Sequence, residues 1–166
     1  MFERIAVSAA AVAVVALCAA TAAFAGSGGA GTQTFTQHGT NDVIIDNPGG
    51  HNPCTGDSGH LLAVSAHDVF HATQQADGTF WVTGTAEGTV TFTADNPSNP
   101  SASGHFALWF GESSNDRNDV QHDTGNFNLT GTDGSHIVLH MADHLSTNAQ
   151  GVVTAQFFVK SVTCGA

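Results

Sequence analysis

The chain has 166 residues and a formal net charge of −11 at neutral pH, from three Lys and Arg against 14 Asp and Glu. This charge argues against nucleic acid and anionic membranes as partners, because proteins bind both through basic side chains that neutralise the phosphates. The chain also contains ten histidines, and its size suits one domain with a hydrophobic core.

Residues 1–25 have the pattern of an export signal. Arg4 supplies a positive charge, residues 5–20 are apolar, and residues 23–25 (Ala-Phe-Ala) form a small-residue cleavage site. We therefore predict a secreted, extracellular protein that is cleaved near Ala25.

The segment after the signal predicts a flexible leader at residues 26–31 (GSGGAG) and a single β domain at residues 32–166. In this domain Thr, Val and Phe alternate at period two, and no long window has the 3.6-residue apolar spacing of a helix. We predict an all-β fold, either a single antiparallel β-barrel or a β-sandwich. Turn signals, among them Asp77-Gly78 and Asp133-Gly134, separate about nine predicted strands, at residues 32–36, 42–46, three between 61 and 93, 105–110, 127–130, 135–144 and 152–164. The polar residues 112–125 are predicted to form a long loop.

Two cysteines, Cys54 and Cys164, follow the export signal. In an exported protein, a pair with no third cysteine to compete is predicted to form a disulfide. The bridge would tie the last strand to the first ordered loop.

Period-two alternation divides the predicted strands into two faces, because successive strand residues point to opposite sides of a sheet. The even-numbered positions are mostly apolar and predict the core face: Leu62, Val64, Ala66, Phe70, Phe80, Val82, Val90, Phe92, Phe106, Leu108 and Phe110. The opposite face carries histidines and both tryptophans: His67, His71, Trp81, His105, Trp109, His136 and His140. Asp68 falls on the predicted core face, so either a bulge turns it away or it has a partner such as Lys160.

The histidine-bearing face is either a plain solvent-exposed side of the sheet or a binding surface. Aromatic rings among hydroxyl and imidazole groups suit a sugar or a small amphipathic molecule, so we predict a ligand site at Trp81, Trp109, His67 and His71. The predicted function is a non-catalytic binding or structural module that needs no cofactor. The alternative is a histidine-dependent metal-binding protein or hydrolase, with Zn or Cu held across strands by His67, His71, His105, His136 and His140.

The segment HDVFH, from His67 to His71, is similar to the metalloprotease motif H-E-x-x-H with Asp in place of Glu. On a helix ending near Gly78 the two histidines would share a face and hold one zinc ion. On a strand they lie about 13 Å apart, at about 3.3 Å per residue, and cannot share an ion. Because the turn signal Ala76-Asp77-Gly78 favours a strand, we do not predict a metalloprotease.

The segment CTGDSG, from Cys54 to Gly59, resembles the nucleophile segment of chymotrypsin-like serine proteases. That family places its base histidine and its aspartate well before the serine, whereas only a short stretch of mature chain precedes Ser58. His60 also stands where that family usually has a second glycine. We interpret the segment as a turn-rich loop that anchors the disulfide, and we assign no catalytic residue.

A wider resemblance rests on the loop Asn52-Pro53-Cys54-Thr55-Gly56, on the strand-turn pattern from His67 to Trp81, on the strand that holds His140 and on the closing Cys164. In these features the chain resembles uncharacterised small exported β-domain proteins of high-GC Gram-positive bacteria. The resemblance implies export, a β-barrel or sandwich and the terminal disulfide, and it implies no activity.

Overall fold

The computed structural model describes residues 31–165, which form eight β-strands and no helix, and therefore no helix that could cross a membrane. The predicted export signal and most of the predicted leader lie outside the described residues. The strands are β1 (Gln33–Gly39), β2 (Val43–His51), β3 (Ser58–Gln74), β4 (Phe80–Ala94), β5 (Ala102–Ser114), β6 (Asn118–Gly131), β7 (His136–Asn148) and β8 (Val153–Gly165).

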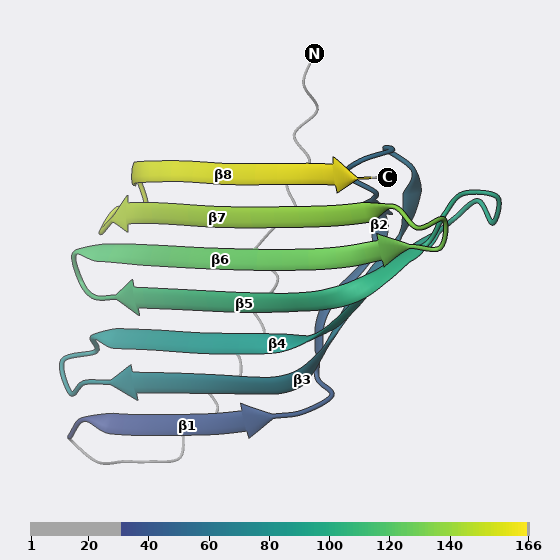
Figure 1. Ribbon diagram of the computed structural model, residues 1–166. Coiled ribbons are helices and arrows are strands. Elements are labelled where there is room, and N and C mark those ends of the chain that lie inside the picture. The colour runs from purple at the N-terminus through teal and green to yellow at the C-terminus, as the bar shows by residue number, and fades with distance from the viewer. Residues whose placement is uncertain (1–30, 166) are drawn as a thin grey trace.

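All the strands belong to one antiparallel sheet in the order β1-β3-β4-β5-β6-β7-β8, and β2 also pairs with β3. Because β3 has 17 residues, its first half pairs with β2 and its second half with β1. From β3 to β8 each strand pairs with the next one in the chain (Figure 1). The prediction of an all-β antiparallel fold is confirmed, and within residues 31–165 the sheet does not close on itself.

The turns show which polar segments interrupt the strands. Gly78 and Gly134 have φ of 86° and 87°, which glycine adopts at no steric cost, and both lie in the predicted hairpin turns. The prediction of a long polar loop at residues 112–125 is wrong, since these residues continue β5 and β6. Only a tight turn separates these strands, and Asn115 Oδ1 holds it by accepting the N–H groups of Arg117 and Asn118.

The prediction of three strands between residues 61 and 93 is also wrong, because only β3 and β4 occupy this stretch. Gly88 lies inside β4, opposite Ser65, at a β-bulge in which Ala66 has no partner. A Cβ on Gly88 would overlap the Val64 carbonyl and lie 2.7 Å from the Ala66 nitrogen. Gly88 is therefore required for close backbone approach to the bulge and not for a turn.

The same bulge reverses the alternation along β3. Before it, the side chains opposite core residues of β4 are Leu61, Ala63 and Ser65, so the predicted core positions Leu62, Val64 and Ala66 are wrong. After the bulge, even positions face the core as predicted. An extra residue shifts the period-two pattern by one position, and composition alone does not locate that residue.

Asp68 stays on the core face, opposite Ala86. The bulge does not turn it away, and its partner is Ser65, whose hydroxyl donates to Asp68 Oδ2 at 2.6 Å. Ser65 is 1% exposed and in turn accepts the Asp42 N–H at 3.1 Å. Lys160 lies in β8, opposite Met141, so it is not the partner.

Two apolar clusters cover the core face. In Figure 1, β2 lies behind the end of the sheet where β3, β4 and β5 bend, and its Ile44 and Ile45 pack on the larger cluster. The smaller cluster, near the other end of the strands, centres on Ala72 and Val82 with three phenylalanines around them. The larger cluster contains Ala63, Ala86, Val90, Phe92, Ala94, Ala102, Phe106, Phe127, Leu129 and Ile137.

Candidate functional site

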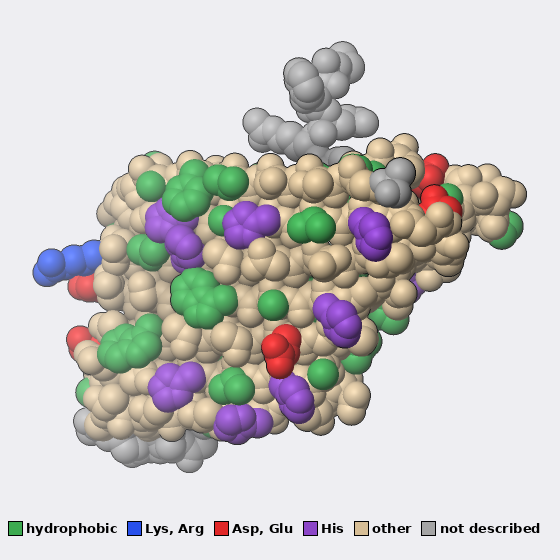
Figure 2. Space-filling model, in the orientation of Figure 1, with side chains coloured by type: hydrophobic (Ala, Val, Ile, Leu, Met, Phe, Trp, Pro, Cys, Tyr) green, Lys and Arg blue, Asp and Glu red, His purple; other side chains and the backbone are tan. Residues whose placement is uncertain are grey.

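The face opposite the core, called here the outer face, is the one to which the exposed threonines of β4 point. The register of β1 and β3 to β7 places nine histidines on it: His38, His60, His67, His71, His105, His122, His136, His140 and His144. Figure 2 shows this face, with histidine side chains spread over the strands and large apolar side chains among them. The predicted grouping of histidines and tryptophans on one face therefore agrees with the register.

The residues of the predicted ligand site do not gather in one place. His71 Nδ1 bonds to the Thr36 hydroxyl at 2.8 Å, and His67 lies opposite Glu87. Trp81 lies opposite Thr73. Trp109 is one strand further on, opposite Thr85, so the two tryptophans are four positions apart along the sheet.

The five histidines of the predicted metal site are likewise separated, and each has other neighbours. His136 Nδ1 contacts the Thr130 hydroxyl at 3.3 Å, and His140 Nδ1 contacts Asn126 Oδ1 at 2.8 Å. His105 lies on β5, opposite Asn128. Among residues 31–165 no group of three or more His, Cys, Asp or Glu side chains is placed to hold a metal ion.

An aromatic row crosses four strands of the outer face instead. Trp109 of β5 meets His122 of β6 edge-on, at 5.6 Å between ring centroids. His122 lies opposite His144 of β7, and their Nδ1 atoms are 3.4 Å apart. His144 stacks on Phe157 of β8 at 5.2 Å and 14°. Both ends of the row are exposed, Trp109 at 39% and Phe157 at 46%, so it can receive a flat ligand.

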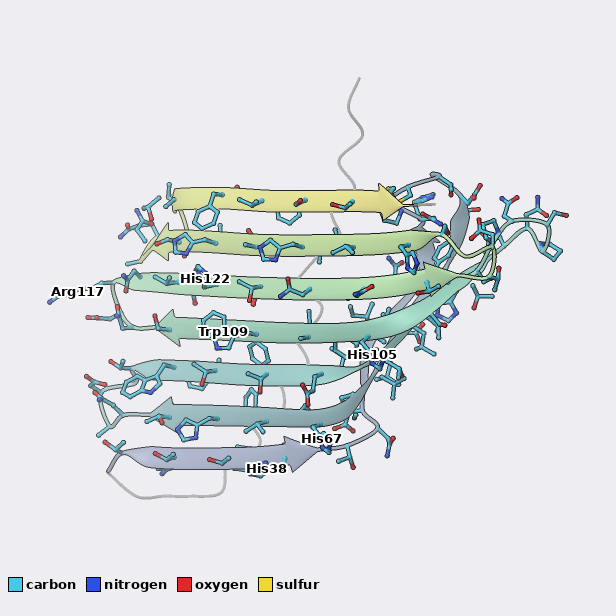
Figure 3. The ribbon with its side chains drawn as sticks, in the orientation of Figure 1. His38, His67, His105, Trp109, Arg117 and His122 are labelled. Carbon is cyan, nitrogen blue, oxygen red and sulfur yellow. A yellow bond between two sulfur atoms is a disulfide. The ribbon has the colours of Figure 1, made fainter. Side chains whose placement is uncertain are left out.

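A hollow of about 620 Å³ lies beside this row, within the usual range for small-molecule sites. Its polar lining comes from Glu87 of β4, His105 of β5, and Asn126 and Asn128 of β6. The apolar part includes Ala66 at the bulge, Ala107 and Val138. Trp109 follows Ala107 as the next outward residue of β5, so row and hollow adjoin. Figure 3 labels Trp109 and His122 of the row and His105 of the hollow.

The sequence prediction missed His122, His144 and Phe157 as site residues. His122 was placed in a polar loop, yet it continues the outward series of Thr130, Asn128 and Asn126 along β6. The signal that could have identified His122 is the period-two alternation of β6, continued backwards from Asn126 through the polar segment.

Four carboxylates of neighbouring strands lie near each other on the opposite face. Asp123 of β6 pairs directly with Asp143 of β7, whose Oδ1 is buried without a hydrogen-bond partner. Burial raises the pKa of Asp123 to about 6, with a further increase from Asp143 and a decrease from His122. Burial also raises the pKa of Glu112 on β5, and Asp119 and Asp123 add to the increase.

The CTGDSG segment forms the disulfide-anchoring loop that we predicted. Cys54 is bonded to Cys164 with a Cα–Cα distance of 5.8 Å. The loop is held by Asn52, which is 5% exposed and whose Oδ1 accepts the N–H groups of Cys54 and Thr55. Asp57 accepts hydrogen bonds from the Thr55 hydroxyl and the Asn99 side-chain amide, which tie the loop together.

Comparison of the chain with protein-family models, with curated proteins and with solved structures finds no match.

Proposed function

We propose that the protein is a secreted, non-catalytic binding module that takes a carbohydrate chain on its outer face. The observation that carries the proposal is the adjoining pair of surfaces, the exposed aromatic row and the polar hollow. Sugar rings present an apolar face that stacks on an aromatic ring and an edge of hydroxyls that needs hydrogen bonds.

Each half of the surface supplies one of these requirements. Trp109 gives a broad and exposed ring, while Asn126, Asn128 and Glu87 offer amide and carboxylate groups one strand away on either side. The disulfide supports export, since such bridges persist in oxidising compartments. The strong negative charge favours a neutral ligand over a polyanion.

The test is a titration of the folded protein with soluble oligosaccharides (maltohexaose, cellohexaose, xylohexaose and chitohexaose), followed by calorimetry and by tryptophan fluorescence. We expect one of these sugars to bind, and Trp109→Ala to weaken its binding by about tenfold or more. Asn128→Ala should also weaken binding, because it removes an amide from the hollow.

Trp81→Ala is the matched control, since Trp81 is the other tryptophan of the same face but lies outside both the row and the hollow. Its affinity should stay within about twofold of the parent, as for surface positions that make no contact. Absence of binding to all four sugars, or equal losses in the two tryptophan variants, would contradict the proposal.

A further inference from the structure

We propose that His122 and His144 form a two-histidine zinc site in the middle of the aromatic row. The site lies within the row that we propose to receive carbohydrate, but it rests on a different observation, and it differs in every residue from the metal site predicted from the sequence. Its basis is the contact between the two Nδ1 atoms, 3.4 Å apart on directly opposed positions of β6 and β7.

The separation of the two nitrogens matches the requirement of zinc. Two nitrogens bound to one tetrahedral zinc, at about 2.0–2.1 Å each, are about 3.3–3.4 Å apart. Ligands at right angles, as in the tetragonal geometry that Cu²⁺ prefers, would be about 2.9 Å apart. The observed 3.4 Å therefore favours Zn²⁺, which would take the place of the direct contact between the two rings.

The two imidazoles are already oriented by their neighbours. Trp109 meets His122 edge-on, and Phe157 stacks on His144 and meets His122 at 77°. These contacts hold both rings in one arrangement, so binding loses little side-chain freedom.

The surroundings distinguish this pair from the other histidines of the face. His71, His136 and His140 each contact a hydroxyl or amide through Nδ1, and His60 bonds to Asp46 through Nε2. On either side of the pair, β6 and β7 place only uncharged residues on this face: Val120, Ser146, Thr124 and Ala142. The protein therefore supplies two ligands, and water would complete the tetrahedron, which makes the ion exchangeable.

The experiment is a calorimetric titration of the folded, disulfide-bonded protein with Zn²⁺. We expect one ion per chain, and a loss of affinity of about tenfold or more in His122→Ala and in His144→Ala, since either substitution leaves one protein ligand. Circular dichroism checks that each variant keeps its sheet. In the parent, Co²⁺ in place of Zn²⁺ should give the intense visible absorption of a tetrahedral ion.

The matched controls are His136→Ala and His140→Ala, which remove histidines from the same face of the same strand, β7. They should change Zn²⁺ affinity by less than about twofold. The proposal is overturned if the parent does not bind Zn²⁺, if the His122→Ala/His144→Ala double variant binds as the parent does, or if the controls lose affinity equally. Because Asn128→Ala removes no zinc ligand, failure of carbohydrate binding and failure of zinc binding are separately visible.

Discussion

The histidine pair on the outer face has uncharged neighbours, whereas Asp123 on the opposite face lies beside other carboxylates. On the outer face, uncharged side chains surround the histidine pair, so nothing opposes the arrival of a cation. On the opposite face, Asp123 and Asp143 stand directly across from each other, and burial and mutual repulsion raise the pKa of Asp123 to about 6. The raised pKa means that the folded state disfavours the ionised form of Asp123.

This unfavourable ionisation leads to a prediction for Asp123→Asn. The pKa of Asp123 is about 6 in the folded protein, compared with an ordinary value of 3.8, so the folded state binds this proton more tightly than the unfolded state. The parent therefore loses stability as pH rises from about 4 through 6. The asparagine variant avoids this loss and should be more stable at pH 7 by about 1 kcal/mol, after allowance for solvent screening. Urea denaturation at pH 7 and pH 4 measures the gain, which should disappear at the lower pH.

Asp133→Asn serves as the comparison. Hydrogen bonds from the Ser135 hydroxyl and N–H lower the pKa of Asp133, so folding favours its ionised form. This substitution should give no gain in stability at pH 7. A gain for Asp123→Asn that persisted at pH 4 would show that repacking, and not ionisation, is responsible.

At the scale of elements, the bulge in β3 sets which side chains reach the outer face. It leaves Ala66 unpaired and forces the two strands so close that Gly88 has no room for a side chain. Ala66 and Gly88 also line the hollow. The local bend of β3 and the depth of the proposed ligand surface therefore have a common origin.

Gly88→Ala should consequently destabilise the protein. The added Cβ meets backbone atoms of β3, which cannot rotate away, so we expect a loss of about 2–3 kcal/mol in the free energy of unfolding. Denaturant unfolding measures it. Gly49→Ala in β2 is the control, because the nearest atom to its added Cβ is Asn47 Oδ1 at 3.7 Å, and it should stay within about 0.5 kcal/mol of the parent. Equal effects of the two substitutions would refute the steric explanation.

At the scale of the whole molecule, the disulfide joins parts of the sheet that hydrogen bonds do not. β8 pairs only with β7 among the described strands, and Phe158 in it is 57% exposed. Cys164 near the end of β8 is bonded to Cys54 in the loop between β2 and β3. In the strand order, β3 lies toward one edge of the sheet and β8 forms the other edge. The covalent link therefore ties β8 to the loop before β3, which strand pairing does not do.

The double variant Cys54→Ser/Cys164→Ser should be less stable by about 4 kcal/mol, because the bridge spans a sequence separation of 110 and restricts the unfolded chain. Urea denaturation measures the loss, and hydrogen exchange should show that the amides of β8 lose protection before those of β4. Unchanged stability, or uniform loss of protection across the sheet, would contradict this role of the bridge.

The sequence alone determined the features that depend on local chemistry. Period-two alternation of Thr, Val and Phe was sufficient for the all-β class, and the Asp-Gly pairs at Gly78 and Gly134 were sufficient for two hairpin turns. The strand assignment also excluded a site in which both histidines of HDVFH bind one metal ion. The pairing of Cys54 with Cys164 followed from their number.

Only the tertiary structure decided which outward residues are neighbours. That depends on strand register, and register depends on where the bulge at Ala66 inserts an extra residue and on where the β5–β6 turn lies. The sequence placed the polar segment before Gly125 in a loop, so His122 could not be set beside Trp109 and His144. Alternation assigns a residue to a face, whereas contact across strands requires the register of every strand between.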